Sequence, residues 1–148
     1  MKFTFELYRA KSKQKGETPQ NKLIITSNDT LHFNSKGQKV KKLRELSCKA
    51  VQDRFGSLKK AKFNSKKQCG VTLTVFYPTN RRSDPDNLQP TLKALLDGFT
   101  DSGLLTDDNH QVVIYTKYCY GGLSGTTGYK LEVEFDKVNS WIILVKML

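Results

Sequence analysis

The residues best suited to chemistry are two aspartates one residue apart, Asp84 and Asp86. Two carboxylates at positions i and i+2 of a loop can both turn toward one hard cation, and Mg²⁺ prefers oxygen ligands while keeping several of its waters. Asp107 and Asp108 form a second acidic pair further along the chain. A bound cation would relieve repulsion among these carboxylates and supply a Lewis acid and an activated water for phosphodiester hydrolysis.

These aspartates belong to a concentration of short acids within residues 84–108. Six of the 14 acidic residues fall there, and they are Asp84, Asp86, Asp97, Asp101, Asp107 and Asp108. An EF-hand calcium loop is excluded, because Leu88 and Gln89 stand where a ligand and the required glycine belong. Two other interpretations stay open. Asp84 and Asp86 also suit a turn and a helix N-cap, and Asp107–Asp108 also suits a polar loop before a strand.

A lysine follows the first acidic pair on a predicted helix. Leu92, Leu95, Leu96 and Phe99 form an apolar stripe at helical spacing. At about 100° per residue, Lys93 and Asp97 lie on the side away from that stripe, so Lys93 points out of the core. A surface ion pair at i, i+4 is the preferred interpretation of Asp97.

Positive charge dominates the rest of the chain, whose formal net charge is +11. Residues 36–67 hold twelve Lys and Arg residues against Glu45 and Asp53 alone. A solvated helix face is the alternative explanation, but so large an excess favours contact with a nucleic-acid backbone through counterion release. The predicted DNA-contacting residues are Lys39, Lys42, Lys49, Lys59, Lys60, Lys66, Lys67, Arg81 and Arg82.

The elements that must position these residues alternate between strand and helix patterns. Strands are predicted at 2–8, 23–26, 71–75, 111–119 and 129–135, with a glycine-rich hairpin connection joining the last two. Helices are predicted over 37–55, closed by Gly56, and from the D-x-D loop to about residue 100. This order predicts a single α+β domain over 1–148, in which two main helices pack on a mixed sheet as a two-layer structure. The apolar tail 137–148 has no assigned role.

Cysteine use and hydropathy predict a cytoplasmic protein without membrane partners. Cys48, Cys69 and Cys119 are odd in number and form no C-x-x-C pair, so free thiols are expected and a zinc site is not. No apolar run approaches the length of a membrane span.

The order of these motifs resembles the RusA family of Holliday junction resolvases, small endonucleases common in phages and prophages. The residues that carry the resemblance are Asp84–Leu88 (DPDNL), Lys93 with Asp97 on the following helix, and Asp107–Asp108 before Val112. Asn28–His32 (NDTLH), with Arg44 downstream, is similar to the family's N-terminal loop and helix. One spacing departs from the pattern. Lys93 follows Asp86 by seven residues where some members have four, although both are one-face helical spacings.

The resemblance implies a RusA-like fold and a homodimer that resolves four-way DNA junctions by paired nicks. Asp84, Asp86 and Asp108 match the metal-binding and catalytic acids, and Lys93 matches an essential lysine. Mg²⁺ is the implied cofactor, with Mn²⁺ as a substitute. The choice between Asp107 and Asp108 stays open, as does the choice for Lys93 between stabilising transition-state charge and protonating the leaving oxygen. The rival functions are a nuclease acting on other branched DNA and a non-catalytic basic nucleic-acid-binding module.

Overall fold

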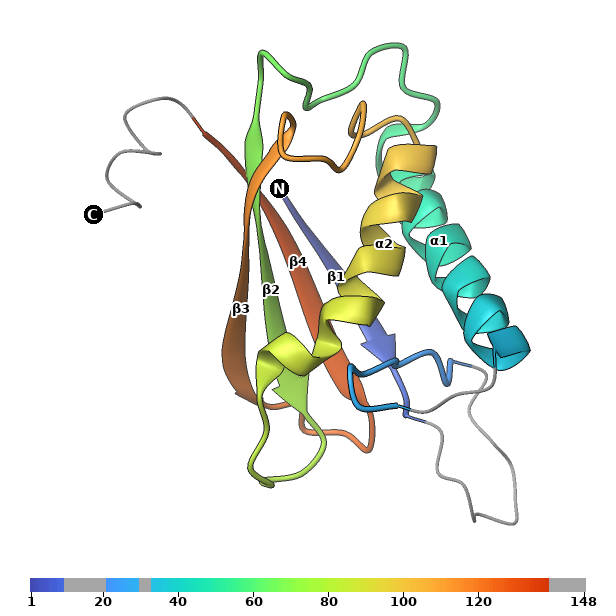
Figure 1. The fold of residues 1–148 in the computed structure, drawn as a ribbon, viewed down its shortest axis with the longest axis vertical. Helices are drawn as coiled ribbons and strands as arrows, with labels where there is room; N and C mark the ends of the chain where they lie inside the picture. Colours follow the sequence, from blue (N-terminus) through green and yellow to red (C-terminus); the bar gives the residue numbers. More distant parts are fainter. Residues whose placement is uncertain (10–20, 30–32, 139–148) are drawn as a thin grey trace.

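The chain forms a four-stranded mixed sheet with two helices on one face (Figure 1). The computed structural model describes residues 1–9, 21–29 and 33–138. The strands are β1 (Lys2–Leu7), β2 (Cys69–Tyr77), β3 (Val113–Leu123) and β4 (Tyr129–Lys137). The helices are α1 (Phe33–Phe55), α2 (Gln89–Asp101) and a short 3₁₀ helix, η1 (Pro85–Leu88). The predicted two-layer α+β class is confirmed.

Alternation in the strands decides which face of the sheet carries the helices. In β1, Phe3, Phe5 and Leu7 are buried while the residues between them are exposed. β4, and β2 from Val71 onward, bury every second residue in the same way. Because successive side chains of a strand point to opposite faces, one face of the sheet becomes apolar and takes up the helices.

The two helices pack on each other at a glycine. The predicted stripe of α2 is buried, and α1 buries Leu43, Ser47 and Val51. A Cβ at Gly98 would lie 1.9 Å from the Ser47 hydroxyl and 2.3 Å from the Arg44 carbonyl oxygen, so only glycine permits this approach. The Ser47 hydroxyl donates to the Leu95 carbonyl oxygen at 2.8 Å, which ties α1 to α2 in the core.

The prediction of a hairpin between the last two strands is wrong. The strand order is β1-β4-β2-β3, so β2 lies between β3 and β4, parallel to the first and antiparallel to the second. The connection instead crosses the end of β2, where the Ser124 amide donates to the Tyr77 carbonyl oxygen at 2.8 Å. Gly122 and Gly125, at φ 101° and 77°, supply the left-handed turns that this crossing requires.

The predicted strand at 23–26 is also wrong, although its apolar residues are buried. Leu23, Ile24 and Ile25 are at most 6% exposed, yet the segment does not join the sheet. The Thr91 hydroxyl accepts from the Ile25 amide at 2.8 Å and donates to the Ile25 carbonyl at 2.7 Å. A side chain of α2 therefore satisfies both backbone groups of Ile25, while the Ile24 amide donates to the Tyr8 carbonyl oxygen at 3.2 Å.

The remaining differences are changes of boundary. α1 begins four residues earlier than predicted, and Gly56 ends it at φ 68°, as expected. β3 continues four residues further than predicted. Cys48, Cys69 and Cys119 are free thiols, of which Cys69 is fully buried. No helix within the described ranges is long and apolar enough to cross a membrane. Residues 139–148 of the apolar tail lie outside the described residues.

Candidate active site

The D-x-D loop leads from the end of β2 into the helices. Asp84 is the N-cap residue of η1, and Asp86 lies in its first turn. The side chain of Asp84 makes no capping hydrogen bond. Both carboxylates are exposed, and neither forms a hydrogen bond or ion pair with any residue that the structure describes. Asp84 thus occupies the predicted N-cap position, where its carbonyl oxygen accepts from the Asn87 amide at 3.0 Å, but its carboxylate takes no part in the cap. Both carboxylates are left facing solvent.

Residues 21–29, which precede α1, are hydrogen-bonded to the D-x-D loop. The Ser27 amide donates to the Asn87 carbonyl oxygen at 2.8 Å, directly after Asp86. Asp29 accepts from the Thr26 amide at 2.9 Å and pairs with Arg9 at 2.6 Å. Together with the Thr91 bonds described above, these contacts connect the N-terminal part of the chain to the start of α2. The rest of the NDTLH motif, residues 30–32, lies outside the described residues.

Lys93 is held by two carboxylates. Its ammonium donates to Asp97 Oδ1 at 3.2 Å and to Asp108 Oδ2. The prediction of a Lys93–Asp97 ion pair is confirmed, and the contact with Asp108 joins the second acidic pair to α2. The hydrogen bond to Asp108 raises the pKa of Lys93. Burial opposes ionisation of Asp108 most strongly, but the hydrogen bond and charge of Lys93, together with hydrogen bonding to Asp97 and Asp107, lower the pKa of Asp108.

The two members of the second acidic pair differ in what they contact. Asp107 accepts from the Asp108 amide at 2.7 Å and from the Asn109 side chain at 3.1 Å, so it stabilises its own loop. Asp108 has only 16% of its side chain exposed and faces Lys93. Of the two, Asp108 is therefore the one that contacts Lys93, and its functional role stays a prediction.

Asp108 is not brought together with Asp84 and Asp86. The D-x-D loop follows the end of β2, whereas Asp108 precedes β3, which starts beside the beginning of β2 because the two strands are parallel (Figure 1). Within the described ranges, no three acidic, histidine or cysteine side chains are close enough to hold one metal ion. Mg²⁺ is commonly bound by one or two carboxylates with waters and substrate phosphates. The free pair Asp84 and Asp86 fits that mode, and Asp108 as a third ligand stays a prediction.

Tyr77, the last residue of β2, is a buried polar residue before the D-x-D loop that the sequence analysis did not single out. It is 7% exposed, and its hydroxyl has no hydrogen-bond partner among the residues that the structure describes. Burial is the main cause that raises the pKa of this hydroxyl to about 12, and the charges of Tyr129, Asp84 and Asp86 add to the rise. Alternation along Val71, Leu73 and Val75 places residue 77 on the core face, so the sequence held a signal for it.

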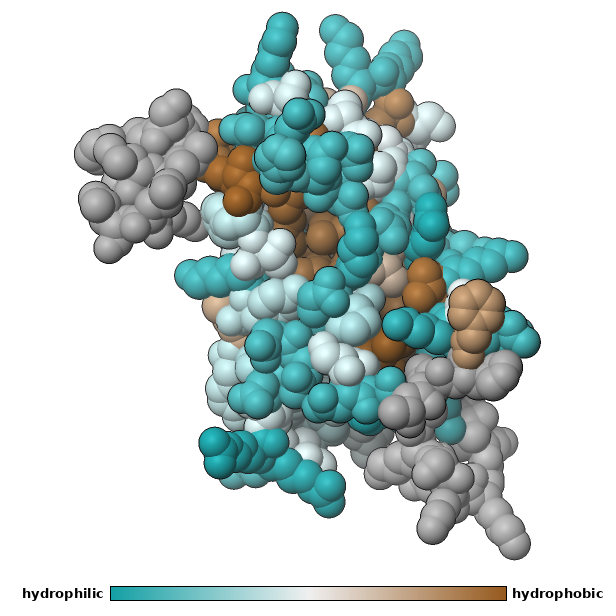
Figure 2. Space-filling model, viewed as in Figure 1, coloured by the Kyte–Doolittle hydropathy of each residue, from teal (hydrophilic) through white to brown (hydrophobic). Residues whose placement is uncertain are grey.

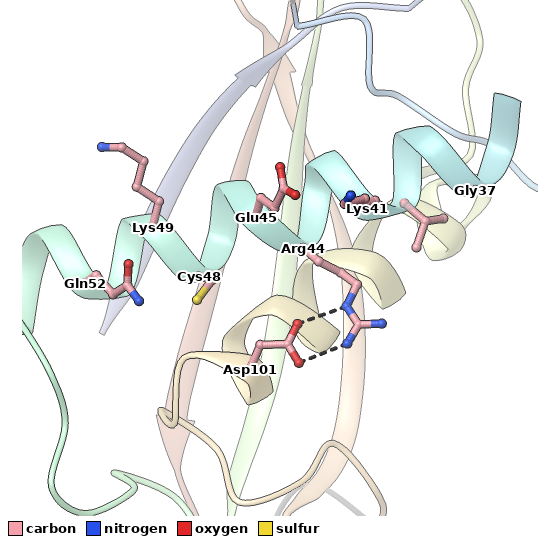
Figure 3. Close-up of a pocket in the computed structure, with 9 residues that line it drawn as sticks. Gly37, Lys41, Arg44, Glu45, Cys48, Lys49, Gln52 and Asp101 are labelled. Carbon is pink, nitrogen blue, oxygen red and sulfur yellow. Dashed lines mark hydrogen bonds and ion pairs between the residues drawn. The ribbon is translucent and has the colours of Figure 1, made fainter.

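The predicted DNA-contacting residues lie in three separate places. Lys39, Lys42 and Lys49 are on α1, and Lys42 and Lys49 line an open groove on one side of this helix. A second groove of about 560 Å³ runs along α1 toward Asp101 of α2. In that groove Arg44 and Asp101 form a two-fold hydrogen-bonded pair, both bonds at 2.9 Å (Figure 3).

The other basic residues lie in loops at opposite ends of the sheet. Lys59, Lys60, Lys66 and Lys67 are exposed in the connection before β2, and Arg81 and Arg82 are exposed after it. None of these six side chains is paired with a carboxylate of the described residues. Most of the surface in the view of Figure 2 is hydrophilic, with hydrophobic side chains visible between the sheet and the helices. Exposed cationic side chains that pair with no carboxylate of the described residues therefore lie at both ends of the sheet.

The comparisons with known proteins place the chain in no group. No protein-family model matches the sequence, and no curated protein matches it.

Proposed function

We propose that this protein is a Mg²⁺-dependent endodeoxyribonuclease that resolves four-way DNA junctions, as the resemblance to the RusA family implies. The observation that supports this most directly is the unengaged carboxylate pair Asp84 and Asp86, beside the unpaired Arg81 and Arg82. A non-catalytic binding module gains nothing from free carboxylates next to its cationic contact surface, because they repel phosphate. A bound divalent cation converts the same carboxylates into a phosphate-binding element.

Asp84 and Asp86 would hold the Mg²⁺ against the scissile phosphate. The cation supplies a Lewis acid and lowers the pKa of an attacking water. Arg81 and Arg82 flank the loop and would contact adjacent phosphates, which positions the backbone without reading its sequence.

The contacts of Lys93 help to choose between its two possible roles, which are stabilising charge in the transition state and protonating the leaving oxygen. A proton donor works best when its pKa lies near the operating pH. The hydrogen bond to Asp108 shifts the pKa of Lys93 upward, away from neutrality. A permanently charged ammonium suits stabilisation of charge on the phosphorane-like transition state better than protonation of the leaving oxygen. We therefore assign the electrostatic role to Lys93 and the task of orienting it to Asp108.

The layout of the basic residues supports a DNA path along the helical face. β2 has nine residues, which at about 3.3 Å per residue separates the two basic loops by roughly 30 Å. That length corresponds to about nine base pairs of duplex. Two such paths related by a two-fold axis would place two symmetric sites on two symmetric strands, so the proposal includes a homodimer.

The proposal is tested with a labelled four-way junction beside a linear duplex of the same arm sequence. We expect paired nicks in the junction with Mg²⁺ or Mn²⁺, none with EDTA, and little cleavage of the duplex. Cleavage of flaps as fast as junctions would identify a broader branched-DNA nuclease. Tight, salt-dependent binding without cleavage in either metal would establish the non-catalytic binding module instead.

Binding should weaken steeply with salt, and the 57–68 connection should account for part of that dependence. Changing Lys59, Lys60, Lys66 and Lys67 to Gln is expected to flatten the slope of log K against log salt by about one for each lysine that contacts phosphate. Fluorescence anisotropy with EDTA present measures the slope. The matched control changes four lysines on the strands, Lys2, Lys117, Lys130 and Lys137. Equal slopes for both quadruple variants would place the contact surface elsewhere.

A further inference from the structure

The end of β3 carries an exposed apolar patch that consists of Tyr120 and Leu123. Tyr120 is 58% exposed and Leu123 is 57% exposed. The two residues lie opposite Val75 and Tyr77 of β2, whose side chains are buried on the face of the sheet that carries the helices. Paired residues of neighbouring strands point to the same face. Because β3 is the outermost strand of the sheet, the helices leave this end of their own face uncovered.

The ring of Tyr120 is supported from the core. It stacks on the buried ring of Tyr77 with centroids 5.8 Å apart, and Tyr129 meets Tyr77 edge-on at 5.6 Å. The Tyr77 carbonyl oxygen accepts from the Ser124 amide at 2.8 Å, which fixes the backbone beneath the stack. A ring held on one side and exposed on the other is a preformed surface for a second planar group, since little conformational freedom is lost on binding.

This patch lies beside the D-x-D loop. The loop begins directly after Tyr77, and η1, which contains Asp86, contacts β3. In Figure 1 the loop and the end of β3 lie at the same end of the sheet. Burial and, after it, the charge of Asp86 raise the pKa of Tyr118, which precedes Tyr120 on the same side of β3. The apolar patch, the exposed carboxylates and the exposed Arg81 and Arg82 therefore share one end of the sheet.

The charges around the patch favour DNA as its occupant. A second copy of the chain docked here would bury the arginines and carboxylates next to the patch, and the cores of protein interfaces are depleted of charged residues because their desolvation is costly. Residues 139–148 would have to reach the patch from the opposite end of the sheet, where the Val138 amide donates to the Gln68 carbonyl oxygen at 3.1 Å. Cationic side chains next to an exposed aromatic ring are the combination that binds unpaired nucleotides, through phosphate contacts and base stacking.

We propose that Tyr120, with Leu123 at its side, stacks against an unstacked base of the junction at the D-x-D loop. Bases inside a continuous duplex are covered on both faces, and taking one out of the stack costs free energy that is smallest where the base is already unpaired. Only DNA that can expose a base, as at a branch point, gains this contact. The inference deepens the proposed function and rests on it, since it requires junction DNA at this loop, and it assigns part of the selectivity for branched DNA to Tyr120.

Tyr120→Ala and Tyr120→Phe test the inference in anisotropy measurements with EDTA, on a four-way junction and on a linear duplex. We expect the alanine variant to bind the junction about tenfold more weakly and the duplex as the wild type does, because one base–aromatic stack is lost. The phenylalanine variant should keep wild-type affinity, since its ring can still stack. The matched control is Phe33→Ala, which removes a ring that is 87% exposed at the start of α1 and should change neither affinity.

A junction with 2-aminopurine at the branch point reports the stack directly. Binding of the wild type and of Tyr120→Phe is expected to change the fluorescence of this base, and binding of Tyr120→Ala is expected to leave it as in free DNA. Equal fluorescence changes for the alanine variant and the wild type, or equal losses of junction and duplex affinity, would overturn the inference.

Two further results would assign the patch to another occupant and so contradict the inference. A change from dimer to monomer in sedimentation of Tyr120→Ala would identify a contact between copies of the chain. A lowered melting temperature with unchanged DNA binding would identify packing within the chain. A wild-type protein that binds junctions without cleaving them would overturn the proposed nuclease activity alone, because the stack is measured with EDTA and without cleavage.

Discussion

Asp84→Asn and Asp86→Asn are each expected to lower the rate of junction cleavage on the order of 1,000-fold, which corresponds to about 4 kcal/mol of transition-state stabilisation. Asparagine keeps the shape of the side chain but removes the charge that attracts Mg²⁺. Junction binding measured with EDTA should stay equal or become tighter, because each substitution removes one charge that repels phosphate. Single-turnover cleavage and anisotropy measure the two effects separately.

The structure makes this a clean test, because neither carboxylate stabilises the fold through a described contact. Asp84 makes no capping hydrogen bond, so its replacement should leave the free energy of unfolding within about 0.5 kcal/mol of the wild type. Glu6→Gln is the matched control, since it removes one negative charge from an exposed position of β1. Wild-type cleavage rates for both aspartate variants in Mg²⁺ would show that the assigned site is wrong.

Lys93→Ala is expected to lower kcat on the order of 100-fold with little change in junction affinity. The interaction of an ammonium with a reacting phosphate strengthens only as charge develops, so its loss affects the transition state more than the bound substrate. Rapid-quench kinetics at saturating and limiting enzyme separate the two parameters. A role limited to the surface ion pair with Asp97 would instead cost about 0.5 kcal/mol of stability and leave cleavage intact.

The control for this substitution is Lys2→Ala. Lys2 also lies between two carboxylates, at 3.3 Å from Glu132 and 3.9 Å from Glu134, and its side chain is 49% exposed against 53% for Lys93. Loss of cleavage in Lys93→Ala alone would therefore report chemistry and not the removal of a bridging lysine. A fully active Lys93→Ala would contradict the assignment.

Lys93→Arg distinguishes the two roles that the sequence left open. Arginine keeps the positive charge but stays protonated at all relevant pH values, so it cannot give a proton to a leaving oxygen. The raised pKa of Lys93 favours electrostatic stabilisation, and we expect this variant to keep a measurable part of the activity that Lys93→Ala loses. An arginine variant as inactive as the alanine variant would favour proton transfer.

The structural features that the sequence alone predicted correctly are those that depend on short-range periodicity. Alternation over residues 2–8 predicted β1 and its buried face, and helical spacing predicted both the core stripe of α2 and the exposure of Lys93. The same spacing placed Asp97 next to Lys93, and the 3.2 Å ion pair confirms it. These features follow from the local geometry of strands and helices, which needs no knowledge of distant residues.

Tertiary structure decided everything that depends on which distant groups meet. Apolar residues at 23–25 resemble a strand, but the Thr91 hydroxyl, 66 positions away from Ile25, satisfies the backbone of Ile25 in place of a neighbouring strand. Two glycine-linked strands resemble a hairpin, but β2 lies between them because its two edges both require partners. Asp108 reaches Lys93 and not the D-x-D pair because β3 runs parallel to β2 and so starts at the opposite end of the sheet. The Tyr77 hydroxyl, which has no hydrogen-bond partner among the described residues, belongs to this second group, because its surroundings depend on the packed core and not on any local pattern.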